Sequence, residues 1–187
     1  MPVERRIYDA SLPLFASWST ESPIFTAVVF LQVYGNEIRA IGAKSWKNQA
    51  LHSCIEDALR IEFERKWRIR THVTPFDRDH VIEEQFTDAG LRSEAAPKVA
   101  DLVILTRRLM ATLVIDQDAD GNEELIEAIN QYAPREKPGG FTLDAGHTLE
   151  QFTCRALEIF AAWKHAGGIE DDWGPAPDYS RSDRARI

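Results

Sequence analysis

Acidic side chains at alternate positions, closely followed by a glycine, are the feature of this sequence best suited to chemistry. The residues with oxygen donors are Asp116, Asp118, Asp120, Asn122, Glu124 and Glu127. Calcium is a hard cation that takes six to eight oxygen ligands, and alternate aspartates can surround it where the chain turns sharply. Gly121 permits such a turn because it has no Cβ. The spacing therefore predicts a site for a hard cation over residues 116–127.

This segment resembles the twelve-residue calcium loop of an EF-hand, which has ligands at positions 1, 3, 5, 7, 9 and 12 and glycine at position 6. The resemblance implies calcium as the ion, held by the side chains of Asp116, Asp118 and Asp120, the backbone carbonyl of Asn122, a water on Glu124 and both oxygens of Glu127. Position 8 is Glu123 instead of an aliphatic residue, and the chain has no second loop, so binding should be weak. The alternative is an acidic turn in which Asp118 or Asp120 caps the following helix.

Composition and charge restrict the classes of function. The 187 residues suit one domain, and a net charge of −8 with a pI near 5.2 opposes a broad grip on nucleic acid. No signal-peptide pattern opens the chain, and the longest apolar run, residues 24–31, is too short to span a bilayer. Cys54 and Cys154 lie in helix-like apolar patterns and are expected to be reduced. We expect a cytoplasmic protein that binds neither membrane nor nucleic acid.

The first half of the chain predicts a hairpin followed by a long helix. Residues 24–34 are apolar and β-branched, Gly35-Asn36 predicts a tight turn, and residues 37–42 alternate in polarity. From Trp46 to Trp67 apolar residues recur every fourth position, so a helix is expected there with Ser45 as its N-cap. Residues 68–74 could return as a strand.

The second half is expected to be mainly helical. Residues 76–96 are polar and irregular, and predict a connection between two halves. Residues 99–115 favour a helix, although residues 113–115 also suit a strand. A short helix at residues 123–133 and a longer one from residue 149 to Gly167 complete the pattern. The expected fold is therefore α+β, an N-terminal antiparallel hairpin or small sheet packed on a long helix, with a mainly helical C-terminal half. We expect one domain with sub-units 1–75 and 97–168.

Residues 169–187 are expected to form an extended tail. Trp173 beside Asp171 and Asp172 predicts a contact with another protein. Because the chain is acidic, we expect that partner to have a basic surface. Since no nucleotide-binding or hydrolase motif occurs, the leading hypothesis is a small acidic regulatory or adaptor protein that acts by protein binding. The alternatives are a calcium-binding protein and an enzyme whose site is dispersed in the sequence.

Two further patterns have simpler explanations. His80 lies near Asp77, Asp79 and Glu83 and could act as a general base with orienting carboxylates, but a solvated loop explains the same residues. The hairpin followed by Ser45-Trp46-Lys47 and a helix faintly resembles a double-stranded RNA-binding domain, which carries more basic residues at that helix start. An ordinary hairpin-plus-helix unit explains it equally.

Overall fold

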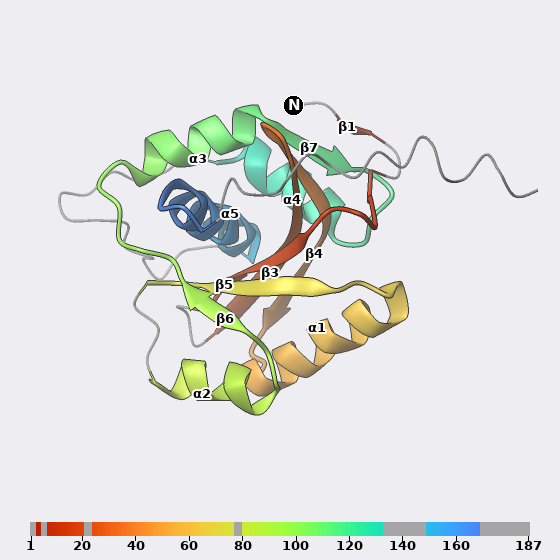
Figure 1. Cartoon of the computed structure of the whole chain (residues 1–187), viewed down its shortest axis with the longest axis vertical. Helices are drawn as coiled ribbons and strands as arrows, with labels where there is room; N and C mark the ends of the chain where they lie inside the picture. The colour runs from red at the N-terminus through yellow and green to blue at the C-terminus, as the bar shows by residue number, and fades with distance from the viewer. Residues whose placement is uncertain (1–2, 5–6, 21–23, 77–79, 133–148, 169–187) are drawn as a thin grey trace, which may run out of the picture.

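One mixed sheet of seven strands organises the protein. The computed structural model describes residues 3–4, 7–20, 24–76, 80–132 and 149–168, and the strands of this part are ordered β1-β7-β4-β3-β2-β5-β6 (Figure 1). The strands are β1 (Val3–Glu4), β2 (Leu14–Ser19), β3 (Phe25–Tyr34), β4 (Glu37–Lys47), β5 (Ile69–Thr74), β6 (Ser93–Ala95) and β7 (Leu113–Asp116). The helices are α1 (Leu51–Arg65), α2 (His80–Asp88), α3 (Leu102–Ala111), α4 (Asn122–Asn130) and α5 (Leu149–His165).

The central hairpin forms where the sequence predicts it. β3 and β4 pair antiparallel from Phe25 opposite Lys47 to Tyr34 opposite Glu37. Gly35 makes the turn with φ +58°, a conformation that side chains with a Cβ rarely adopt. A register shift beside Phe30 leaves one extra residue in β4, which bends the strand next to Gly42.

The expected small hairpin sheet is wrong, because five further strands extend the hairpin on both sides. β2 pairs antiparallel with β3 and parallel with β5, while β7 pairs parallel with both β4 and β1. β6 pairs parallel with β5 at one edge. The fold is thus an α/β arrangement around a mixed sheet, in which four of the six strand pairings of the described residues are parallel and the two longest are antiparallel. β2 escaped prediction because all six of its residues are buried, so its sequence lacks the polar and apolar alternation of a half-exposed strand.

Helices cover both faces of the sheet, and each face has its own core. α3, α4 and α5 pack on one face, where Phe15, Leu31 and Phe160 are buried (Figure 1). α1 and α2 lie on the other face, over Trp18, Phe30 and Ile55. Because side chains alternate across a strand, neighbouring residues of β2 supply both cores.

Several helix boundaries differ from the predictions. The expected helix from Trp46 begins at residue 51, because β4 continues to Lys47, and its N-cap is Ala50 instead of Ser45. The polar connection at residues 76–96 contains α2 and β6. Residues 113–115 form β7, which was the alternative to a continuous helix. Among the described helices, none is long and apolar enough to cross a bilayer.

Candidate functional site

The acidic segment that predicts a calcium site connects β7 to α4 and is tied to β4. The carboxylate of Asp116 is buried and accepts hydrogen bonds from the backbone N–H groups of Ile7, at 3.3 Å, and Asp118, at 3.1 Å. Asn122 donates its side-chain amide to the carbonyls of Ala40, at 3.1 Å, and Asp116, at 2.7 Å. These contacts hold the loop in place, and two backbone N–H groups are bound to the Asp116 carboxylate that an ion would need.

Three other acidic residues of the loop have different partners. Asp120 forms an ion pair with Arg65, Glu124 accepts a hydrogen bond from the Ser45 hydroxyl at 3.1 Å, and Glu127 accepts one from Gln131. Among the described residues, no three His, Cys, Asp or Glu side chains are grouped closely enough to hold a metal ion. The alternative of an aspartate cap is also absent, because the N-cap of α4 is Gly121 and no side chain caps it.

A cavity of about 340 Å³ lies where this loop meets β4 and the end of α1. Trp67 and Phe30 give it aromatic walls, with ring centroids 5.1 Å apart. Its charged lining residues come from three elements and are Lys44, Glu64, Arg65, Asp120 and Glu124. The cavity thus combines an aromatic surface with a charged lining.

Two glycines shape the cavity. A Cβ on Gly42 would lie 3.2 Å from Cη2 of Trp67, so the missing side chain leaves room beside the indole. Gly121, with φ +79°, lies against β4, and a Cβ there would lie 1.9 Å from the carbonyl oxygen of Ala43. The backbone N–H of Ala43 donates to the carbonyl of Asp120 at 3.2 Å. The close approach of loop and strand therefore requires glycine at position 121.

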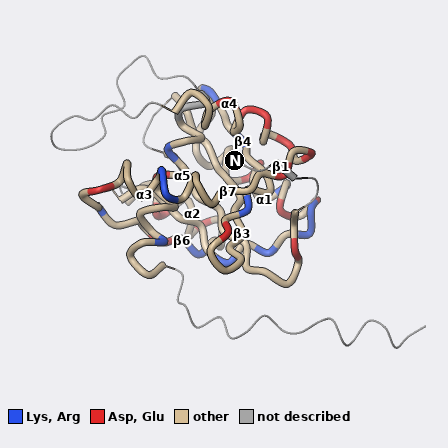
Figure 2. Tube along the Cα trace, turned by 90° about the horizontal axis from the view of Figure 1, so that it is seen from above, with Lys and Arg blue, Asp and Glu red and all other residues tan. Residues whose placement is uncertain are grey.

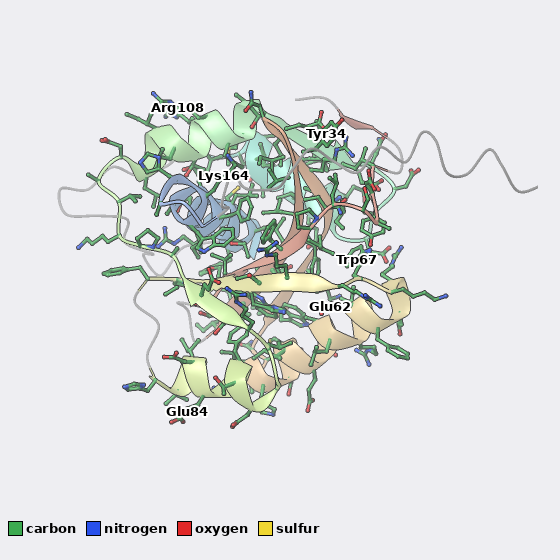
Figure 3. All side chains as sticks on the ribbon, in the orientation of Figure 1. Tyr34, Glu62, Trp67, Glu84, Arg108 and Lys164 are labelled. Carbon is green, nitrogen blue, oxygen red and sulfur yellow. The ribbon has the colours of Figure 1, made fainter. Side chains whose placement is uncertain are left out.

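A second polar group is buried in the core beneath α1. The indole Nε1 of Trp18 donates to Nδ1 of His72 at 3.1 Å, and Nε2 of His72 lies 3.8 Å from Oε1 of Glu62. This oxygen of Glu62 has no hydrogen-bond partner among the described residues. The three residues come from β2, β5 and α1, and Figure 3 shows Glu62 on the helix side of the sheet.

Burial controls the protonation of this group. Loss of solvent raises the pKa of Glu62 to about 7 and lowers the pKa of His72 to about 4. His72 is therefore neutral at pH 7, and because its Nδ1 accepts a hydrogen bond, its proton is on Nε2, facing Glu62. Shifted pKa values of this kind occur at functional sites and also in structural cores.

Parallel strands β2 and β5 end at the same edge of the sheet, a place where open α/β sheets commonly bind ligands. The described side chains at this edge carry hydroxyl groups. Ser17 donates its hydroxyl to the carbonyl of Ala156 in α5 at 2.7 Å, while the buried hydroxyls of Ser19 and Thr20 have no partner among the described residues. The carboxylates that come next in the sequence, Glu21 and Asp77, lie outside the described residues.

The other sequence candidates are not brought together. His80 begins α2, while Asp77 and Asp79 lie outside the described residues, as do Trp173, Asp171 and Asp172. Both cysteines are buried and free, and burial raises their pKa values to about 11 for Cys54 and about 12 for Cys154. Neither thiol is thus poised as a nucleophile.

Sequence reasoning missed Glu62, His72 and Trp67. One signal was available: Glu62 follows Ile55 and Ala58 on the buried face of α1, at spacings of three and four residues. A carboxylate on an apolar face points to a buried polar partner. His72 and Trp67 gave no comparable signal, since their neighbours belong to other elements.

The fold is shared with nuclease domains of bacteriophage large terminases, although no protein-family model and no curated protein matches the sequence. The nuclease domain of the SPP1 large terminase g2p, with bound Mn, has a TM-score of 0.57 and 16% identity, covering 88% of this chain and 95% of that domain. The nuclease of the thermophilic phage G20c with bound cobalt has a TM-score of 0.56 and 11% identity, over 86% of this chain and 90% of that one.

Longer terminases match over part of their length. The large terminase of another thermophilic bacteriophage has a TM-score of 0.64 and 11% identity, covering 86% of this chain. This chain spans 42% of that terminase. The shared architecture is an RNase H-like α/β fold. The EF-hand resemblance is therefore wrong, and so is the classification as a calcium-binding regulatory protein, because the acidic loop is one connection within a different fold.

The metal-bound nucleases allow a test of the donor groups in this chain. Mn, cobalt and magnesium are bound in those structures, and such ions take oxygen and nitrogen ligands that usually include several carboxylates. The described residues of this chain offer hydroxyls at the ends of β2 and β5 and dispersed carboxylates elsewhere. They do not fit a divalent metal centre.

Proposed function

We propose that the protein acts on DNA as a domain of the large-terminase nuclease type. The observation that carries the proposal is the match with the isolated SPP1 nuclease domain, which extends over 88% of this chain and 95% of that domain. A match of this extent includes the sheet and its helices, not a common substructure. One fold can host many functions. The match therefore supports action on DNA, and whether the protein cleaves DNA has to be tested by experiment.

This proposal replaces the hypothesis of an acidic adaptor protein. That hypothesis was based on missing sequence motifs and on a net charge of −8, which also argued against nucleic acid. Net charge describes the whole surface, whereas binding depends on the local arrangement of charges. Figure 2 shows basic and acidic segments interspersed along the described chain, so the acidic balance does not exclude a basic binding surface.

Metal-dependent hydrolysis would require carboxylates from outside the described residues. Glu21 follows β2 in the sequence, and Asp77 and Asp79 follow β5. A second candidate function is DNA binding without hydrolysis. The observation that favours it over hydrolysis is that the described residues hold no group of side chains suited to a metal ion, while the Ser17 hydroxyl of β2 is buried and bonded to the carbonyl of Ala156.

The test is a joint cleavage and binding experiment on the full chain. Plasmid and linear DNA are incubated with the protein in Mg²⁺, Mn²⁺ or Co²⁺, with EDTA as the control, and binding is measured in parallel by mobility shift. Cleavage that EDTA abolishes, and that Glu21→Ala or Asp77→Ala reduces, supports the nuclease. Binding without cleavage supports the second candidate. A protein that neither binds nor cleaves DNA overturns both.

A further inference from the structure

A local concentration of positive charge lies between α1 and β5, despite the negative net charge of the chain. The four basic residues of this turn are Arg65, Lys66, Arg68 and Arg70. All four are exposed. Arg65 is paired with Asp120, whereas Lys66 and Arg68 form no ion pair within the described part of the chain. Exposed cations without partners are free to bind phosphate groups.

An aromatic side chain lies in the middle of this basic turn. Trp67 is partly exposed, packs on Phe30 with ring centroids 5.1 Å apart, and lies 6.0 Å from the ring of Tyr8. Its indole forms a wall of the cavity of about 340 Å³ beside Gly42. Stacking on an aromatic side chain favours the binding of any base, whatever the sequence of the strand. The turn thus combines a stacking surface with phosphate-binding groups.

The lining of the cavity adds a chemical preference. Glu64, Asp120 and Glu124 line it, and their carboxylates accept hydrogen bonds but cannot donate them. Cytosine and adenine present exocyclic amino groups that donate to carboxylates. The three carboxylates outnumber the two cations of the lining, Lys44 and Arg65, and repel phosphate, so the backbone of a bound strand would follow Lys66 and Arg68 instead.

We propose that the α1–β5 turn binds single-stranded nucleic acid, with phosphates on Lys66 and Arg68 and one amino-bearing base in the cavity beside Trp67. A single strand is required because a base within a duplex is stacked and paired, and cannot enter the cavity. The inference rests on the proposed action on DNA and specifies where and in which form a strand is held.

The test compares oligonucleotides by fluorescence anisotropy over a series of salt concentrations. The probes are oligodeoxycytidine of about twelve nucleotides and an abasic strand of equal length. The first variant is Lys66→Glu/Arg68→Glu. Its matched control is Arg107→Glu/Arg108→Glu, two exposed arginines of α3 with the same change in charge. Figure 3 shows Arg108 on the far side of the molecule from Trp67. The second variant, Gly42→Val, fills the cavity, and its melting temperature verifies that it folds.

Two results are expected. Lys66→Glu/Arg68→Glu weakens the binding of both probes by about tenfold or more. It also reduces the slope of log K against log salt concentration by about 1.4, the value for two phosphate contacts on a single strand. Gly42→Val removes the preference of the protein for oligodeoxycytidine over the abasic strand and leaves the abasic affinity unchanged. The α3 control binds both probes like the unmodified protein.

Other results overturn the inference. If the α3 control weakens binding as much as the Lys66 and Arg68 variant, charge alone explains the affinity and no site lies at this turn. If dCMP binds as tightly as the oligomer, the cavity is a nucleotide pocket and not part of a strand-binding surface. DNA binding that neither variant changes removes this inference and leaves the proposed function standing. Complete absence of DNA binding removes both.

Discussion

The indole Nε1 of Trp18 donates a hydrogen bond to Nδ1 of His72 across 3.1 Å, in the core between the sheet and α1. This contact fixes the tautomer of the imidazole, so that the Nε2 hydrogen faces Oε1 of Glu62 at 3.8 Å. Two ionisable groups are thereby held in a largely buried site, where the side chain of His72 is 3% exposed and that of Glu62 is 11% exposed. Their protonation should make the stability of the protein depend on pH.

Glu62 should destabilise the protein above pH 7. Its pKa is about 7 in the folded state and 4.5 when solvated, so the folded state binds its proton more tightly. The stability associated with this proton is complete below pH 4.5 and is lost as the pH rises through 7. By linkage the loss is about 3 kcal/mol. Glu62→Gln should therefore be more stable than the unmodified protein at pH 8 and equally stable near pH 4.5, measured by urea unfolding.

His72 has the opposite dependence. Its pKa falls from 6.5 to about 4 on folding, so its contribution is complete above pH 6.5 and is lost as the pH falls through 4. Stability should consequently decline on both sides of an intermediate pH. In Glu62→Gln the acid decline should remain, because His72 is unchanged. An acid decline that disappears in Glu62→Gln would show that the two groups do not titrate separately.

Trp18→Phe should destabilise the protein by about 2–4 kcal/mol, because it creates a small cavity and leaves Nδ1 of His72 without its donor. Trp46→Phe is the matched control. Its indole is stacked on that of Trp18 and donates to Asp57, which lies nearer the surface and can bond to water instead. The control should lose about 1 kcal/mol. If thermal unfolding gave equal losses of stability for the two variants, the hydrogen bond from Trp18 to His72 would contribute no more to stability than the one from Trp46 to Asp57.

Gly121→Ala should unfold the loop or the whole domain, with a loss of at least about 3 kcal/mol. The added Cβ would meet the carbonyl of Ala43 at 1.9 Å, and φ is +79°. Gly35→Ala is the control because φ is +58° there and nothing lies within 4 Å of its Cβ position. Backbone strain alone should lower the free energy of unfolding of the control by about 1 kcal/mol, measured by thermal unfolding. A tolerated Gly121→Ala would contradict the close packing of loop and strand.

Calcium should not stabilise the protein. A ligand at a hundred times its Kd raises the free energy of unfolding by about 2.7 kcal/mol, which would be visible as a higher melting temperature. Asp116, Asp120 and Glu124 bind protein partners, and no three acidic side chains of the described residues converge, so millimolar calcium should not raise the melting temperature above its value in millimolar magnesium. A rise specific to calcium, lost in Asp118→Ala, would restore the ion site at residues 116–127.

The predictable parts of the fold were those with local signals. Gly35 turns the chain with a positive φ between an apolar segment and an alternating one, so the β3–β4 hairpin was evident from neighbouring residues. α5 was equally evident from its helical periodicity. β2 and β7 were not, because short strands buried on both faces have no characteristic period and depend on neighbours distant in the sequence.

The acidic loop shows why site prediction failed. Its spacing matches a calcium loop, yet Asp116, Asn122 and Glu124 each find a partner in residues 7–45, far away in the sequence. Spacing determines which oxygens could converge, and tertiary contacts determine where they point. Conversely, Trp18, Glu62 and His72 come from three separate elements, and no local pattern joins them.

The sequence by itself determined the hairpin, the helical periods of α1 and α5, and the net charge, since these follow from neighbouring residues. The tertiary structure decided the sheet order, the partners of the acidic loop, the buried Trp18–His72 contact and the cavity beside Trp67. Parallel strand pairing and the burial of polar groups depend on contacts between distant segments. Those contacts form once the whole sheet is assembled.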